Sequence, residues 1–185
     1  MGMQVVEHMG DLEAALAQAQ AVADAAFANG GLYLERWIEK PRHIEYQILA
    51  DEYGNAMHLY ERECSVQRRH QKLIEESPAP GIDAKVLREQ AQRGADICAQ
   101  LGYNNLGTME TLYSDGDSGF LEMNTRIQVE HGVTEEVTGI DLVQQQILLS
   151  AGADLPAHPS AMKGHAIEVR LYAEDAKTLM PSTGM

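Results

Sequence analysis

A nine-residue stretch, residues 122–130, has a charged or amide side chain at every second position. In extended backbone, successive side chains point to opposite faces, so this pattern predicts a strand with one uninterrupted polar face. The polar face carries Glu122, Asn124, Arg126, Gln128 and Glu130. Carboxylate and amide oxygens suit a hard cation, whereas a guanidinium suits an oxyanion. The row therefore indicates either a reaction site or, as the simpler alternative, an exposed edge strand.

Hydrophobic periodicity and turn residues divide the rest of the chain into helices and strands. Helices are predicted at residues 11–28, 83–101 and 140–151, with Asp11 and Asp83 as N-caps. Strands are predicted at residues 1–6, 32–38, 43–51, 56–62, 72–76, 106–114, 119–126 and 165–172. Residues 131–139 are expected to form a loop or broken turn, and Lys40-Pro41 marks a candidate hinge. Helices laid on successive hairpins predict a layered α+β fold.

The composition is that of a globular, acidic protein. Of its 185 residues, 44% are hydrophobic, which is enough for a core, and the formal net charge is -14. This charge argues against nucleic acid as a partner, because phosphate binding draws on clustered Lys and Arg. No apolar run approaches the roughly 18 residues of a membrane span, and Cys64 and Cys98 lack metal-ligand spacing. We therefore expect a cytoplasmic protein with free thiols and no membrane partner.

Two of the predicted strands meet at residues 115–118, which have the composition of a hairpin turn. Antiparallel pairing of these strands places Glu110 beside Glu122. Because like charges opposed on a sheet repel, this pair needs a compensating cation, and Asn124 adds a third oxygen donor. The three residues therefore predict a site for Mg²⁺ or Mn²⁺, and a salt-bridge network is the alternative.

Basic residues and a further carboxylate complete the candidate site. Arg126 offers a planar fork for a small oxyanion, and Lys72 offers a point charge for the same anion. Glu130 lies eight residues from Glu122 on the predicted polar face and is a candidate general base. His70, inside a basic run, is a candidate phosphate contact. The alternative for the cations is simple neutralisation of an acidic surface.

Two long motifs contain these residues. The first reads Glu-Arg-Glu-Cys-Ser-Val-Gln-Arg-Arg-His-Gln-Lys over residues 61–72, followed by Glu75-Glu76 and by Pro-Ala-Pro at residues 78–80. The second reads Phe-Leu-Glu-Met-Asn-Thr-Arg-Ile-Gln-Val-Glu-His over residues 120–131. Neither a P-loop nor a Rossmann glycine motif occurs. The chain resembles the biotin carboxylase family of ATP-grasp ligases, as found in biotin-dependent carboxylases such as acetyl-CoA carboxylase.

The resemblance implies an ATP-grasp fold of the α+β class, an antiparallel sheet with packed helices that is truncated at both ends. It covers the middle of the family's catalytic unit. Residues 1–38 correspond to a remnant of the lid subdomain, and residues 39–185 correspond to part of the carboxy-terminal catalytic subdomain. We expect the Rossmann-like domain, the glycine-rich phosphate lid and the end of the antiparallel domain to lie outside this sequence.

Functional residues of the family carry over by position. Its ATP-binding positions correspond to Glu35, Arg36, Ile38, His43, Gln67 and His70. Its metal positions correspond to Glu110, Glu122 and Asn124. Its bicarbonate pocket corresponds to Lys72, Arg126, Gln128, Val129 and Glu130, with Glu130 as the base. Arg170 corresponds to the arginine that stabilises the biotin enolate, so the implied catalytic set is Glu130, Arg126, Lys72 and Arg170. Gly132 departs from the pattern, because Pro is common there.

The implied activity is ATP-dependent carboxylation of biotin with bicarbonate, through carboxyphosphate. Its cofactors would be ATP, Mg²⁺ or Mn²⁺, and biotin carried on a separate domain. A carboxyltransferase would be a partner, and a homo-oligomer is a further option. Two alternatives stay open at this point: a carboxyphosphate-forming ligase that acts on urea or ammonia, and a non-catalytic piece that binds nucleotide or serves as an interaction surface. The final carboxyl acceptor does not follow from the sequence.

Overall fold

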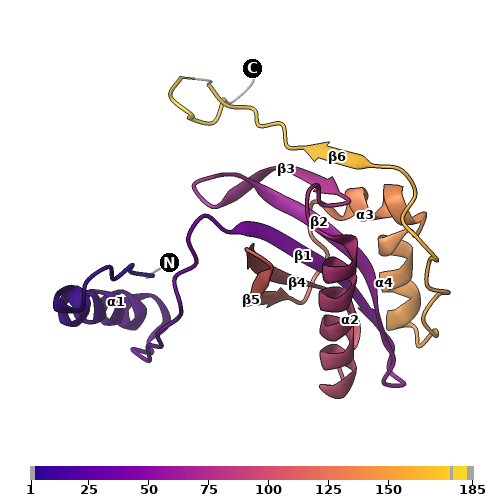
Figure 1. Ribbon diagram of the computed structural model, residues 1–185, viewed down its shortest axis with the longest axis horizontal. Coiled ribbons are helices and arrows are strands. Elements are labelled where there is room, and N and C mark those ends of the chain that lie inside the picture. Colours follow the sequence, from indigo (N-terminus) through magenta and orange to yellow (C-terminus); the bar gives the residue numbers. More distant parts are fainter. Residues whose placement is uncertain (1–2, 176, 183–185) are drawn as a thin grey trace. The chain divides into compact units, whose positions relative to one another are not determined.

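The computed structural model describes residues 3–175 and 177–182, and the chain divides into two compact units, Met1–Glu39 and Lys40–Met185 (Figure 1). The first unit contains the short 3-10 helix η1 (Met9–Asp11) and helix α1 (Leu12–Phe27). Helix α1 confirms the helix expected from the Ala-rich periodicity, and it has no buried residue. Asp11 occupies the N-cap position as predicted, although its side chain makes no capping hydrogen bond.

The strands predicted in the first unit are wrong where the structure describes them. Residues 3–6 and 32–38 form no strand, and residues 1 and 2 lie outside the described part of the chain. An alternating pattern creates a strand only where another strand accepts its backbone hydrogen bonds. No strand lies among residues 3–39 to serve as that neighbour.

The second unit is built on a six-stranded sheet in the order β5-β4-β1-β2-β3-β6, and every neighbouring pair is antiparallel (Figure 1). Its strands are β1 (Arg42–Ala50), β2 (Ala56–Arg68), β3 (Gln71–Ser77), β4 (Asn105–Ser114), β5 (Asp117–Asn124) and β6 (Ala166–Val169). Both predicted hairpins, β1–β2 and β4–β5, are confirmed. Strand β6 is shorter than the eight residues expected for it.

Three helices pack on this sheet: α2 (Ala84–Gln100), α3 (His131–Thr138) and α4 (Leu142–Ser150). Asp83 caps α2 as predicted, because its carboxylate accepts a hydrogen bond from the backbone N–H of Lys85. The loop predicted at residues 131–139 is wrong, since α3 occupies it and ends at Gly139. Its Val and Thr residues have weak helix propensity, but Val133, Thr134 and Val137 are buried, and tertiary packing supplies the stability.

Strand β1 lies at the centre of the unit and is covered on both faces. Ile44, Tyr46 and Ile48 point to one face and pack against Leu87, Ala91, Ala95 and Cys98 of α2. On the opposite face, Leu49 packs with Leu142 and Leu149 of α4. The alternation of the strand therefore places Glu45 and Gln47, both buried, on the face away from α2. This second face carries the polar residues of the candidate site.

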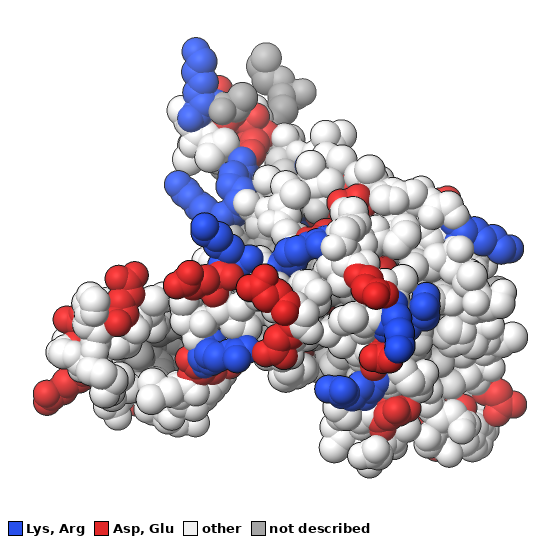
Figure 2. Space-filling view, viewed as in Figure 1, with Lys and Arg blue, Asp and Glu red and all other residues white. Residues whose placement is uncertain are grey.

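Charged groups of both signs lie on the surface. Figure 2 shows acidic and basic side chains intermingled over the visible face. Within the part of the chain that the structure describes, no helix is both long and apolar enough to cross a bilayer.

Cys64 and Cys98 are buried free thiols, as the sequence predicted.

Candidate active site

Arg62 is the centre of a buried polar network on the second face of the sheet. Its side chain is fully buried and donates hydrogen bonds to five side chains from four parts of the fold. The acceptors are Glu45 at 2.6 Å, Gln47 at 2.8 Å, Thr134 at 2.9 Å, Gln128 at 3.1 Å and Thr108 at 3.3 Å. Burial is the largest influence on the pKa of Arg62 and would lower it, but Glu45 together with Cys64 and Glu130 raises the pKa overall. Arg62 thus ties β1, β2, β4, α3 and the loop after β5 together.

Lys72 is the second buried cation, and three carboxylates surround its ammonium group. Its Nζ atom contacts Glu45, lies 2.8 Å from Glu110 Oε1 and lies 2.7 Å from Glu130 Oε1. Burial by itself would lower the pKa of Lys72, but the neighbouring carboxylates, led by Glu45, raise it. Lys72 is therefore charged at neutral pH and joins strand β1, strand β4 and the start of α3.

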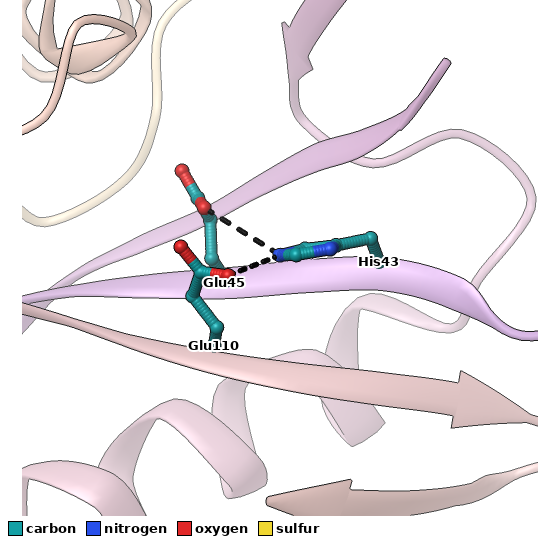
Figure 3. A group of neighbouring side chains, drawn as sticks. All are labelled: His43, Glu45 and Glu110. Atoms are coloured by element: carbon teal, nitrogen blue, oxygen red, sulfur yellow. Dashed lines mark ion pairs between the residues drawn. The ribbon is translucent and has the colours of Figure 1, made fainter. Parts of the chain in front are cut away.

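Glu110 accepts contacts on both of its oxygens. Oε1 receives hydrogen bonds from Lys72 at 2.8 Å, from Asn124 at 2.9 Å and from Gln128 at 2.6 Å. Oε2 lies 2.8 Å from His43 Nε2 (Figure 3). Burial acts to raise the pKa of Glu110, but His43 and Lys72 overcome this and lower it to about 2. Glu110 is accordingly a carboxylate throughout the physiological pH range.

This lowered pKa predicts a loss of stability in acid. Glu110 protonates near its ordinary pKa of 4.5 in the unfolded chain but only near 2 in the folded one. Its contribution is therefore complete above about pH 4.5 and is lost as the pH falls towards 2. Urea unfolding of the chain from pH 7 to pH 3 is expected to show a steeper loss of stability for the native sequence than for Glu110→Gln. Equal pH dependence of the two proteins would contradict this.

Glu130 lies between two cations. Oε1 accepts from Lys72, and Oε2 accepts from Arg170 at 2.8 Å. Burial raises the pKa of Glu130, but Lys72 and the other cations lower it overall, so the group is ionised. Arg170 also donates to Glu75 Oε1 at 2.8 Å, and Glu75 Oε2 is buried without a hydrogen-bond partner among the described residues. Of the predicted catalytic residues, Glu130, Lys72 and Arg170 are thus brought together.

The continuous polar strand predicted at residues 122–130 is wrong beyond Asn124. Strand β5 ends there, and Glu130 is the N-cap residue of α3. The intervening loop turns Gln128 and Glu130 inward, where they are buried, because Arg62 and Lys72 offer them charged partners. Arg126 is exposed, and its Nη2 atom donates to Asn124 Oδ1 at 3.3 Å.

Arg126 and Lys72 are linked through two other side chains: Asn124, which accepts from Arg126 at 3.3 Å, donates to Glu110 Oε1 at 2.9 Å, and the same oxygen lies 2.8 Å from Lys72 Nζ. Val129, also predicted in the bicarbonate pocket, is 61% exposed. Its backbone carbonyl lies 3.2 Å from His131 Nδ1. Gln128 alone of these loop residues reaches into the buried network, as a bridge from Arg62 to Glu110.

The three predicted metal ligands do lie together. Glu110 and Glu122 are direct partners in the β4–β5 register, as expected. Asn124 Nδ2 donates to Glu110 Oε1 at 2.9 Å and to Glu122 Oε1 at 3.3 Å. The repulsion that called for a cation is relieved in part by Lys72 and His43 and by the exposure of Glu122. The set fits a hard cation, since turning the Asn124 amide over would present three oxygens.

The residues predicted to contact nucleotide fall in both units. In the second unit, Gln67 Nε2 lies 3.1 Å from His43 Nδ1, which joins two of them. His70 is exposed in the tight turn between β2 and β3, with φ of 64°. The remaining three, Glu35, Arg36 and Ile38, belong to the first of the two compact units.

Glu45 and Arg62, two fully buried charges of the network, were missing from the predicted site. A signal for them existed in the sequence. His43, Glu45 and Gln47 alternate with Ile44, Tyr46 and Ile48, so a strand with a fully apolar face carries charge on its other face. Only the sheet order shows that strand β1 is buried on both faces. A charge on its second face therefore needs a buried cation as a partner.

Comparison with known proteins agrees with this geometry. Residues 1–158 match the family described as "Carbamoyl-phosphate synthase L chain, ATP binding domain". The chain is 54% identical over 185 residues to a protein named biotin carboxylase from Allochromatium vinosum, covering 99% of this chain and 41% of that protein. It thus spans about two-fifths of the length of this relative.

Two solved structures share the fold. A complex of the Campylobacter jejuni biotin carboxylase with β,γ-ATP superposes with a TM-score of 0.91 at 47% identity, over 97% of this chain and 41% of that one. The second is the biotin carboxylase domain dimer of the Hydrogenobacter thermophilus 2-oxoglutarate carboxylase, in complex with MgADP, ADP and bicarbonate. It superposes with a TM-score of 0.88 at 41% identity, again over 97% of this chain and 41% of that one.

Sequence, fold and site geometry thus agree with the resemblance found in the two motifs. The antiparallel sheet with packed helices is the ATP-grasp architecture of these relatives. The chain belongs to the family of the carbamoyl-phosphate synthase L chain ATP-binding domain, and within it to the biotin carboxylases.

Proposed function

We propose that the protein containing this chain carboxylates biotin with ATP and bicarbonate, and that the buried network binds and activates bicarbonate. The observation that carries this proposal is the position of Glu130, an ionised carboxylate between Lys72 and Arg170. A base flanked by two cations suits a small anion that must lose a proton. The bound bicarbonate named in the Hydrogenobacter thermophilus structure supports the same substrate.

The two cations and the base act on bicarbonate together. Lys72 and Arg170 stabilise negative charge, so they lower the pKa of a bicarbonate hydroxyl held between them, and this offsets the weak basicity of Glu130. Glu130 takes the proton, and the carbonate oxygen attacks the terminal phosphorus of ATP to give carboxyphosphate and ADP. Gln128, fixed by Arg62 and Glu110, lies beside these groups and orients the anion.

The metal and nucleotide contacts form the second half of the proposal. Glu110, Glu122 and Asn124 would hold Mg²⁺ or Mn²⁺, which would supply positive charge against the phosphates. His43, Gln67 and His70 contact the nucleotide from the second unit, and Glu35, Arg36 and Ile38 contact it from the first. In this assignment the first unit is the lid remnant and the second is the catalytic subdomain. Arg126 and Val129 contact bicarbonate from the loop between β5 and α3.

The products and partners follow from the same assignment. Cleavage of the C–O bond of carboxyphosphate gives CO₂ and phosphate, and the phosphate takes the ring N–H proton of biotin. The resulting enolate, stabilised by Arg170, attacks CO₂ through its ring nitrogen. The biotin is carried on a separate domain, and a carboxyltransferase passes the carboxyl group to the final acceptor. We place the protein in the cytoplasm, because its buried thiols are reduced, and we infer a homo-oligomer by analogy with the dimer named above.

The test is an acceptor comparison in the full-length protein. Bicarbonate-dependent phosphate release from Mg-ATP is measured with free biotin, urea or ammonia as the acceptor. Stimulation by biotin is expected, with no stimulation by urea or ammonia. Stimulation by urea or ammonia without biotin would replace the proposal with another carboxyphosphate-forming ligase.

The 185-residue chain alone is expected to show little or no biotin-dependent turnover. It spans about two-fifths of its relatives, and phosphoryl transfer needs the nucleotide to be held from several sides with water excluded. Calorimetric titration with Mg-ATP and the phosphate-release assay measure affinity and turnover, with the full-length protein as the positive control. Turnover by the short chain close to that of the full-length protein would contradict this expectation.

A further inference from the structure

His43, Glu45 and Glu110 form a mixed nitrogen and oxygen cluster at the buried centre of the sheet (Figure 3). Their potential ligand atoms all lie within 4.8 Å of one another. His43 Nε2 is buried and has no aligned hydrogen bond among the described residues, although Glu110 Oε2 lies 2.8 Å away. The imidazole nitrogen thus faces two carboxylates at ion-pair distances of 2.8 Å and 3.9 Å.

We propose that this cluster binds one borderline divalent transition-metal ion, of which Zn²⁺ is the representative. Imidazole nitrogen and carboxylate oxygen are common Zn²⁺ ligands, whereas Mg²⁺ prefers oxygen alone. The site is therefore distinct in chemistry from the hard-cation set Glu110, Glu122 and Asn124, with which it shares one residue.

The spacing needs little adjustment. With metal–ligand bonds of about 2.1 Å, two ligands on one ion are about 3.0 Å apart at a right angle and about 3.4 Å apart at the tetrahedral angle. His43 Nε2 and Glu110 Oε2, at 2.8 Å, need only a small separation to admit the ion. Glu45 Oε2 lies 3.9 Å from the same nitrogen, within reach of a third bond.

The surroundings supply both support and opposition. Gln67 lies 3.1 Å from His43 Nδ1 and holds the ring. When the metal takes Nε2, the ring proton resides on Nδ1, and the Gln67 amide accepts it after turning its oxygen towards the ring. Lys72 and Arg62 oppose the ion, because the ammonium of Lys72 contacts Glu45 and Glu110 and the guanidinium of Arg62 lies 2.6 Å from Glu45 Oε1. The affinity is therefore set by competition between the ion and these two cations, of which Lys72 contacts two of the three ligands.

Glu110 belongs both to this cluster and to the proposed Mg²⁺ site, so Zn²⁺ binding affects catalysis. This effect rests on the proposed function. An ion held by His43, Glu45 and Glu110 withdraws Glu110 from the Mg²⁺ site and His43 from the nucleotide. Zn²⁺ and Mg-ATP then exclude each other in the full-length enzyme. Binding of Zn²⁺ itself is measured on the 185-residue chain and does not depend on any activity.

The experiment is calorimetric titration of the chain with ZnCl₂ in a non-chelating buffer. One Zn²⁺ per chain is expected, and His43→Gln is expected to weaken binding about tenfold or more, the effect of losing one ligand bond of about 1.4 kcal/mol or more. His158→Gln removes an exposed imidazole elsewhere and serves as the matched control, with affinity unchanged. Glu122→Gln, which damages only the hard-cation set, is also expected to leave Zn²⁺ affinity unchanged.

Lys72→Met provides a test that loss of folding cannot imitate. Removing the ammonium is expected to tighten Zn²⁺ binding by about tenfold or more, because a like charge in contact with the ligands is gone. Lys85→Met, an exposed lysine on α2, is the control for net charge. If circular dichroism shows that His43→Gln is not folded, the comparison of Lys72→Met with Lys85→Met tests whether Zn²⁺ binds at this cluster.

The inference is overturned by three results. These are an absence of Zn²⁺ binding, binding that folded His43→Gln leaves intact, and binding that Glu122→Gln abolishes. Unchanged or weaker binding by Lys72→Met, with His43→Gln unfolded, also overturns it. Intact biotin carboxylation with no Zn²⁺ site would refute the inference alone, and a Zn²⁺ site in an inactive protein would refute the proposed function alone.

Discussion

Replacement of Glu130 by Gln is expected to lower bicarbonate-dependent turnover of the full-length enzyme by about 10²- to 10⁴-fold, the range for loss of a general base. Glutamine keeps the shape of the side chain, and its one amide oxygen can still accept from either Lys72 or Arg170, which donate to different oxygens of Glu130. It cannot accept the bicarbonate proton. The measurement is kcat and KM for bicarbonate in the biotin-dependent phosphate-release assay, read as free energies of the transition state.

Glu136→Gln is the matched control for this variant. Glu136 belongs to the same helix α3 but is exposed, so its replacement removes one carboxylate without touching the network. Its turnover is expected to equal that of the native enzyme. Full bicarbonate-dependent turnover by Glu130→Gln would show that another group takes the proton, and the role assigned to Glu130 would be withdrawn.

Replacement of Arg62 by Met is expected to lower the free energy of unfolding of the chain by about 3–5 kcal/mol, the usual cost of leaving a buried charge without its partner. Arg62 is fully buried, and its loss leaves the Glu45 carboxylate without the guanidinium that lies 2.6 Å from it. Gln47, Thr134 and Gln128 lose a donor at the same time. Urea unfolding followed by circular dichroism gives the change in free energy.

Arg68→Met is the control for the loss of a guanidinium. Arg68 lies on the same strand β2 and pairs with Glu174 near the surface, where solvent screens the pair. A much smaller loss of stability is expected for this variant. If Arg62→Met destabilised the chain no more than Arg68→Met, the buried network would be held together by its other members, with Lys72 foremost.

Local sequence patterns predicted those elements whose stability comes from neighbouring residues in the chain. Helix α2 begins at a capping Asp83, and the β4–β5 hairpin turns at a Gly-containing stretch, so turn and cap chemistry was sufficient for both. Helix α3 was missed, because its Val and Thr residues favour a strand until the sheet buries them. Strands at residues 3–6 and 32–38 were overpredicted for the converse reason, since no neighbouring strand pairs with them.

The candidate site shows the same division. Alternation and hairpin register placed Glu110 opposite Glu122, and the two motifs identified Lys72, Glu130 and Arg170 by position. Extending the alternation to residue 130 was wrong, because the chain leaves the sheet after Asn124. The inward turn of the following loop depends on cations contributed by β2 and β3, more than 50 residues earlier in the chain. Sequence periodicity does not show which distant residues, such as Arg62 and Lys72, will lie next to the loop.

The sequence by itself determined the family, the antiparallel hairpins, the α+β class and the residue types from which a site could be built. Only the tertiary structure decided which of those residues meet: Glu45 and Arg62 became the buried centre, and Arg126 and Val129 remained at the surface. The reason is electrostatic. A buried carboxylate is stable only where a cation reaches it, and in this protein those cations come from strands that the chain order separates and the sheet order brings together.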